Sequence, residues 1–156
     1  MKLRPPQQHE LDAVSALCLR SKAVWGYDEA FLDACRSELT IRASELKTSE
    51  LRVAEQDGAV IGVAQITLDG ETADLQKLFV EPAAIGLGVG KLLFAWARGT
   101  AQELGARRLT IESDPGAVGF YKKMGAIECG SVLSGSIPGR MLPRLQVELG
   151  TPATRA

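Results

Sequence analysis

A glycine-rich loop between an expected strand and an expected helix constrains the fold of this chain most. The strand covers residues 75–80 and is closed by Glu81 and Pro82. Residues 86–90 follow as Gly-Leu-Gly-Val-Gly, and Lys91 starts an amphipathic helix. Alternating glycines let backbone N–H groups converge on one point, where the positive end of the helix dipole also attracts an anion. The loop therefore predicts a site for a phosphate-bearing ligand.

The spacing of this loop differs from the two best-known phosphate-binding motifs. A P-loop begins with glycine and ends in Gly-Lys-Ser/Thr, whereas Ile85 stands at the first position here and Leu92 at the last. A dinucleotide fingerprint has two residues between its second and third glycines, and only Val89 lies there. On the loop alone, the alternative is a glycine turn that simply starts a helix.

Composition indicates one domain over residues 1–150 and a disordered tail over residues 151–156. The chain has 156 residues, of which 46% are apolar, so it can bury a core. A net charge of -1 provides no field that would attract nucleic acid or an acidic membrane, and no apolar run approaches bilayer-spanning length. Three widely spaced cysteines show no metal-ligand pattern and fit a reducing compartment. We expect a cytoplasmic protein that binds no metal, nucleic acid or membrane.

Hydrophobic periodicity predicts an α/β (α+β) chain with a mixed, mostly antiparallel central sheet flanked by helices. Turn signals at residues 56–58 and 69–70 separate the strands of an antiparallel meander. Asp28 and Asp114 are good helix N-caps. The expected strands begin at Leu3 and then cover residues 51–55, 59–68, 75–80, 108–112, 126–133 and 144–149, and the expected helices cover residues 11–18, 29–39, 91–104 and 115–124.

The short helix after Asp114 provides the second chemical signal. Phe120 and Tyr121 lie on its apolar face, and Gly125 ends it. Aromatic pairs with this spacing usually belong to a core. A tyrosine on a mostly buried face still needs a partner for its hydroxyl, so Tyr121 is also a candidate to point into a cleft.

Together, these features resemble the GNAT superfamily of N-acetyltransferases. The resemblance lies in the order of the elements from Leu3 to about Leu149: a meander, a Gly-x-Gly-x-Gly loop, a long helix, a strand, a short helix with Phe-Tyr-x-x-x-Gly, and terminal strands. The most specific parts are residues 78–82, 86–91 and 117–125, and residues 21–27 and 136–140 resemble a bacterial subgroup. The resemblance implies a GNAT-type acyl-CoA N-acyltransferase fold.

The resemblance also implies acetyl-CoA as the co-substrate. Family members splay the central sheet beside the strand that ends at Val80, and the pantetheine arm lies in that gap. Ile85 stands where the family usually has Gln or Arg, and Asp114 where it often has Asn, so we expect weaker coenzyme binding, which Lys91 could offset. The implied coenzyme-binding residues are Leu78, Phe79, Val80, Gly86, Leu87, Gly88, Val89, Gly90, Lys91 and Asp114.

For catalysis, the resemblance places Tyr121 at the position of the family's general acid and a backbone N–H near Val80 at the oxyanion. Proton transfer from a phenol to a thiolate is uphill by about 2 kcal/mol, which permits transfer concerted with departure of the thiolate. The general base stays open between Asp74, Glu112 and water. His9, the only histidine, lies among polar residues and does not suggest a Ser-His triad.

The acceptor site is implied at Trp25, Tyr27 and the segment that ends at Arg140. The two aromatic residues would form an apolar or cation-binding wall, and Arg140 would hold a substrate carboxylate; an interhelix plug and a surface arginine are the alternatives. We expect the acceptor to be a small-molecule or peptide amine, and exposed C-terminal strand edges suggest a homodimer. A non-catalytic acyl-CoA-binding sensor or partner module and an unrelated nucleotide-binding protein stay open as other functions.

Overall fold

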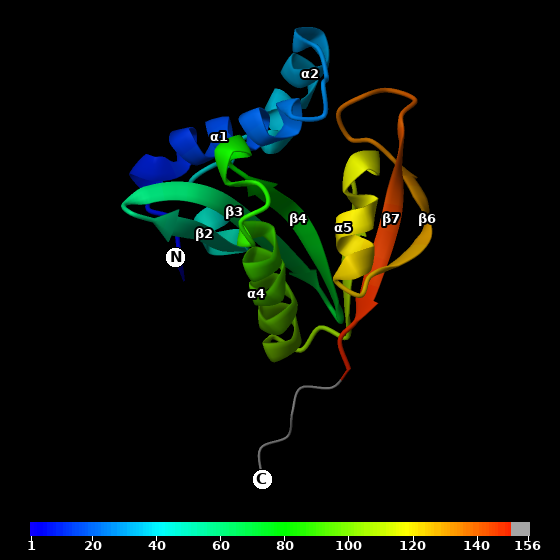
Figure 1. Cartoon of the computed structure of the whole chain (residues 1–156). Helices are drawn as coiled ribbons and strands as arrows, with labels where there is room; N and C mark the ends of the chain where they lie inside the picture. Colours follow the sequence, from blue (N-terminus) through cyan, green and yellow to red (C-terminus); the bar gives the residue numbers. More distant parts are fainter. Residues whose placement is uncertain (151–156) are drawn as a thin grey trace.

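The computed structural model describes residues 1–150 and shows a seven-stranded sheet with helices on both faces (Figure 1). The strand order is β1-β2-β3-β4-β5-β7-β6, and all neighbours are antiparallel except β4 and β5. The predicted fold class, a mixed, mostly antiparallel sheet flanked by helices, is confirmed. The predicted tail, residues 151–156, lies outside the described residues. The strands are β1 (Lys2–Arg4), β2 (Glu50–Gln56), β3 (Ala59–Asp69), β4 (Thr72–Val80), β5 (Arg108–Glu112), β6 (Ile127–Leu133) and β7 (Met141–Glu148).

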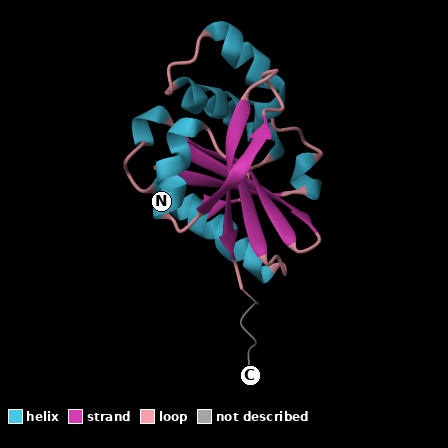
Figure 2. Cartoon of the chain, turned by 90° about the vertical axis from the view of Figure 1, so that its right-hand side faces the viewer, coloured by secondary structure: helices cyan, strands magenta, loops and turns pink. Residues whose placement is uncertain are grey.

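The two faces of the sheet are covered by different helix pairs. Figure 2 shows helices around the fan of strands. Leu17 of α1 and Cys35 of α2 pack with Val63 on one face, while Phe94 of α4 and Tyr121 of α5 pack on the other. The helices are α1 (Leu11–Ala23), α2 (Glu29–Leu39), α3 (Glu45–Thr48), α4 (Val89–Glu103) and α5 (Val118–Lys123), with short 3-10 turns at η1 (Gln8–Glu10), η2 (Pro82–Ala84) and η3 (Pro115–Ala117).

Most predicted elements occur, and the differences have local causes. Asp28 caps α2 as predicted, with its carboxylate accepting the Phe31 N–H at 2.8 Å. The prediction missed α3 because its four residues are too few to show a helical period. The helix α4 begins at Val89 rather than Lys91 because Gly88 already serves as its N-cap, in the left-handed conformation.

Two strands also begin three residues earlier than predicted. The strand β4 begins at Thr72 rather than residue 75, because exposed Asp74 interrupts its apolar pattern without ending the ladder with β5. The strand β7 begins at Met141 and includes Pro143. Pro143 has no N–H to donate, and its carbonyl accepts the Ser113 N–H at 2.9 Å.

The strands β4 and β5 pair over only half of β4. Their parallel register runs from Thr72 opposite Arg108 to Leu75 opposite Ile111. Gln76 then has no partner on β3, and such a bulge increases the local twist of a strand. Beyond it, residues 76–80 leave β5, and Figure 1 shows β4 and β7 diverging toward the top of the view, with β4 approaching α1. The sheet is therefore open between its two halves.

Candidate active site

The opening between β4 and β5 holds a cavity of about 500 Å³. A cavity of this size suits a cofactor or a small ligand. Its lining combines the splayed half of β4 with the end of α1, the start of α4, the turn before α5, α5 itself and residues 134–142. Four residues singled out from distant parts of the sequence therefore come together on its wall: Trp25, Val80, Tyr121 and Arg140.

The glycine loop leads into the N-terminus of α4 beside this cavity. Gly86 and Gly88 have φ values of 88° and 84°, a region that residues with side chains rarely adopt. Leu92 is the first residue whose N–H joins the helical ladder, bonding to the Gly88 carbonyl at 3.1 Å. The N–H groups of Val89, Gly90 and Lys91 precede it and have no helical partner, which is the arrangement by which a helix N-terminus can bind an anion.

The third glycine of the loop serves packing rather than a left-handed turn. Gly90 lies inside α4, and a Cβ there would lie 3.4 Å from the Phe120 ring, so its small size lets α4 and α5 approach. Ile85 is half exposed and lines the cavity, while Leu87 and Lys91 are exposed. The Ile85 side chain presents only apolar atoms, so the polar groups at this position of the loop are those of the backbone.

Tyr121 lies with its ring in the core and its hydroxyl at the cavity. Its ring contacts Phe94 and Phe120 at centroid distances of 5.7 and 5.2 Å. The hydroxyl has no hydrogen-bond partner within residues 1–150. Every fully buried polar side-chain atom in those residues does have a partner, so the Tyr121 oxygen is not fully buried. It therefore opens onto the cavity that Tyr121 lines. Burial raises the pKa of Tyr121, so the phenol stays protonated well above neutral pH.

The free edge of β4 faces the cavity through residues 78–80. Glu81 donates its N–H to the Ile61 carbonyl at 2.8 Å on the β3 side. Since N–H directions alternate along a strand, the Val80 N–H points into the gap. There it meets the hydroxyl of Ser21 at 3.2 Å. Sequence analysis did not single out Ser21 as a site residue, because nothing local links it to a strand 59 positions away.

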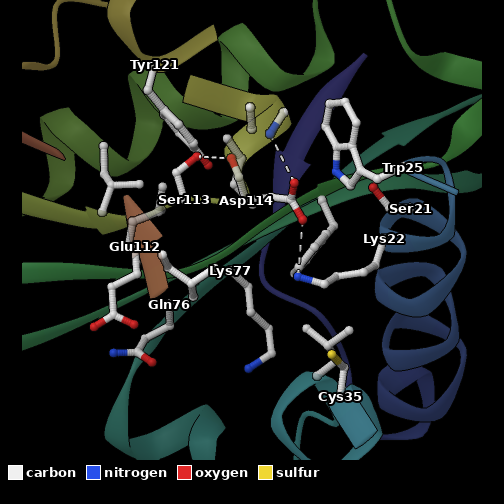
Figure 3. A pocket seen from close by; sticks show the side chains of 18 of the residues that line it. Ser21, Lys22, Trp25, Cys35, Gln76, Lys77, Glu112, Ser113, Asp114 and Tyr121 are labelled. Atoms are coloured by element: carbon white, nitrogen blue, oxygen red, sulfur yellow. Dashed lines mark hydrogen bonds and ion pairs between the residues drawn. The ribbon is translucent and has the colours of Figure 1, made fainter. Parts of the chain in front are cut away.

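Asp114 is the centre of a cluster of charged and aromatic groups (Figure 3). Its carboxylate accepts the Tyr27 hydroxyl at 2.6 Å and lies 3.5 Å from Lys22 Nζ and 3.7 Å from an Arg140 nitrogen. Arg140 also donates to the Tyr27 oxygen at 2.6 Å and lies 4.8 Å from the centre of the Phe31 ring. The positive charges of Lys22 and Arg140 thus offset the negative charge of the Asp114 carboxylate. Asp114 would therefore repel a nearby phosphate less than the sequence alone suggested.

Trp25 joins this cluster to the turn before α5. It is 47% exposed, and a Cβ on Gly116 would lie 2.6 Å from its ring, so only glycine permits this contact. Trp25, Tyr27 and Arg140, singled out separately from the sequence, therefore lie in one connected region, with Trp25 and Arg140 on the cavity wall itself. Arg140 is held by Tyr27 rather than free on the surface.

Two carboxylates lie where β4 and β5 begin to part. Asp74 accepts the hydroxyl of Thr110, and burial raises the pKa of Asp74. Burial and then repulsion from Asp74 and Glu38 raise the pKa of Glu112. All of these residues line the cavity, whereas His9 lies in η1 away from it. Both candidate bases therefore bind a proton more readily than a carboxylate with an ordinary pKa does.

Residues 1–150 contain no cluster of side chains that could hold a metal ion, and no helix long and apolar enough to cross a bilayer. Cys18 and Cys35 are buried and Cys129 is exposed, all as free thiols.

Comparison with known proteins identifies the family. A family profile described as an acetyltransferase (GNAT) domain matches residues 10–135, so this chain belongs to the GNAT acetyltransferases, as its motifs indicated. A comparison with curated protein sequences finds no significant match.

Solved structures agree with this fold. The PaiA N-acetyltransferase of Thermoplasma acidophilum in complex with coenzyme A is 16% identical, with a TM-score of 0.80 over 94% of this chain and 98% of that one. A GCN5-related N-acetyltransferase from Rhodopseudomonas palustris is 24% identical, with a TM-score of 0.79 over 95% of each chain. YncA from Salmonella typhimurium, solved with its cofactor acetyl-CoA, is 20% identical, with a TM-score of 0.69 over 100% and 98%. At these identities the likeness establishes the fold.

Proposed function

We propose that residues 1–150 form a single acetyltransferase domain that moves an acetyl group from acetyl-CoA to a primary amine by direct attack. The observation that carries this proposal is the cavity between β4 and β5, with unpaired N–H groups of α4 on one side and the Tyr121 hydroxyl on another. Membership of the GNAT family and the coenzyme-bound neighbours support acetyl-CoA as the donor.

The coenzyme is proposed to bind along both elements that frame the cavity. Its diphosphate accepts the free N–H groups of the loop and of the first turn of α4, contributed by Gly86, Gly88, Val89, Gly90 and Lys91. Leu87, the other loop residue predicted to bind the coenzyme, already donates its N–H to the Ala84 carbonyl at 3.3 Å. Its pantetheine arm pairs with the open edge of β4 at Leu78, Phe79 and Val80, in place of a missing strand. Asp114 holds the turn before α5 beside that arm, through its bonds to Tyr27 and Gly116.

In the proposed reaction, a neutral amine attacks the thioester carbonyl while Tyr121 acts as the general acid. The raised pKa of Tyr121 keeps its proton in place at neutral pH and makes it a weak acid. It therefore gives the proton up only as negative charge develops on the departing sulfur. Asp74, Glu112 or water takes the proton of the amine.

The acceptor is proposed to enter beside the cluster of Trp25, Tyr27 and Arg140. Trp25 supplies an aromatic surface, and Arg140 is oriented by Tyr27 and Asp114 as a planar donor for a carboxylate. A small-molecule or peptide amine that also carries a carboxylate fits this wall.

Two measurements test the proposal. Thermal shifts with acetyl-CoA, coenzyme A and ATP should show stabilisation by the two coenzyme forms and none by ATP alone; the reverse pattern would indicate the nucleotide-binding alternative. Release of free thiol from acetyl-CoA should then occur with at least one member of an amine panel. Tight coenzyme binding with no thiol release across the panel would favour the sensor instead.

A further inference from the structure

The hydroxyl of Ser21 is directed at the open edge of β4 rather than at its own helix. A serine within a helix often donates to the carbonyl one turn earlier, as Ser15 does to Leu11 at 2.7 Å. Ser21 lies in the last turn of α1, and its oxygen instead accepts the Val80 N–H at 3.2 Å. Within the described residues it donates to no protein group, so its proton is free to bond with a ligand in the cavity that it lines.

A neighbouring ion pair joins the same two segments. Arg20 donates from two nitrogens to both carboxylate oxygens of Glu81, at 2.8 and 2.7 Å. Two consecutive residues of α1 thus contact two consecutive residues at the end of β4. This arrangement holds the Ser21 hydroxyl beside the N–H that would face a thioester oxygen.

We propose that Ser21 is a catalytic residue that forms a two-donor oxyanion hole with the Val80 N–H, an inference that rests on the proposed function. The thioester oxygen replaces the Ser21 oxygen as acceptor of the Val80 N–H, and the Ser21 hydroxyl donates its proton to the same thioester oxygen. As the amine nitrogen bonds to the carbonyl carbon, the π electron pair moves onto that oxygen, where both donors stabilise it. Re-forming the C=O bond breaks the C–S bond, and the thiolate takes the Tyr121 proton while the amine proton leaves to base or water.

The test compares Ser21→Ala, Ser21→Thr and the control Ser44→Ala, an exposed serine that makes no side-chain cap. Hydroxylamine replaces the amine, because this small nucleophile needs no acceptor pocket, and thiol release from saturating acetyl-CoA is followed. Ser21→Ala should lower kcat by about 10²-fold, as loss of one oxyanion donor does elsewhere. Its dissociation constant for coenzyme A should not change, since coenzyme A has no carbonyl at that position. Ser21→Thr keeps the hydroxyl and should retain most of kcat.

The outcomes separate this inference from the proposed function. Wild-type turnover that persists unchanged in Ser21→Ala overturns the Ser21 role alone. Loss of coenzyme A affinity together with kcat in Ser21→Ala, without rescue by Ser21→Thr, shows that the hydroxyl only holds α1 in place and also overturns it. No thiol release by the wild-type protein, with hydroxylamine or with any amine, contradicts the proposed function itself.

Discussion

At the scale of single residues, the cluster around Tyr27 shows how one hydroxyl joins three segments of the chain. Tyr27 donates to Asp114 and accepts from Arg140, each at 2.6 Å, while its ring stacks on Phe31 at 3.9 Å. The hydroxyl therefore links the connection after α1 to the turn before α5 and to the segment before β7. Sequence patterns singled out these residues without showing that they bond to one another.

Tyr27→Phe should destabilise the protein while leaving the stack with Phe31 intact. Hydrogen bonds to charged groups contribute about 1.5–3 kcal/mol, so a loss of that order is expected in the free energy of unfolding, measured in urea. The coenzyme A affinity should fall slightly, because the turn that Asp114 holds beside the pantetheine arm loses its bond to Tyr27 while the N–H groups of α4 are unchanged. An unchanged unfolding midpoint would show that water replaces the hydroxyl at no cost.

The Glu10 carboxylate gives the stability of the fold a defined pH dependence. Hydrogen bonds from Arg4 and from the Gln7 N–H hold the pKa of Glu10 at about 2, below its ordinary 4.5. Because this pKa is lower in the folded chain than in the unfolded one, the ionised carboxylate stabilises the folded chain fully above pH 4.5, and this stabilisation is lost as the pH falls toward 2. Glu10→Gln should therefore be less stable than wild type at pH 7, with the difference shrinking on acidification. Urea titrations that give the same difference in stability at pH 7 and at pH 2 would contradict this prediction.

At the scale of elements, the position of α4 depends on a glycine in the strand beneath it. A Cβ on Gly62 of β3 would lie 2.8 Å from both Leu93 and Val89 of α4. Any side chain there would push the helix outward. Since the anion-binding N–H groups belong to the first turn of α4, this contact ties the core to the proposed diphosphate site.

Gly62→Ala should destabilise the fold by about 1–3 kcal/mol through overpacking, and should also weaken coenzyme A binding. The matched control is Gly99→Ala on α4, where a Cβ would meet nothing within 4 Å. That change should stabilise the helix by about 0.5–1 kcal/mol and leave binding unchanged. Calorimetry and coenzyme A titrations measure both quantities. Equal behaviour of the two variants would refute the proposed role of the close contact.

At the scale of the whole molecule, the sequence predicted correctly those elements whose residues show a local pattern of their own. The helix α4, the meander turns and the cap Asp28 follow from patterns within a few residues. The extent of β4 did not, because its pairing with β5 and the bulge at Gln76 depend on strands elsewhere in the sheet. Ser21 was missed as a site residue for the same reason: its contact with Val80 exists only once α1 crosses the splayed sheet.

The exposed outer edge of the sheet is consistent with the homodimer predicted from the sequence, which stays a prediction. The strand β6 forms one edge of the sheet, and Ile127 and Leu133 on it are 70% and 67% exposed. Apolar side chains on an open edge favour association of two copies. Light scattering at several concentrations would give the mass, and a constant monomer mass would contradict this expectation.

The most direct test of the proposed acetyl transfer is a comparison of wild type and Tyr121→Phe with acetyl-CoA and a reactive amine. Thiol release and the acetylated amine, the latter measured by mass spectrometry, should appear in equal amounts with the wild-type protein. Tyr121→Phe keeps the ring that packs on Phe94 and should bind coenzyme A normally, yet lose about 10²–10⁴-fold in kcat, as expected for loss of a general acid. Unchanged kcat in this variant would contradict the role of Tyr121, and thiol release without acetylated amine would contradict acetyl transfer.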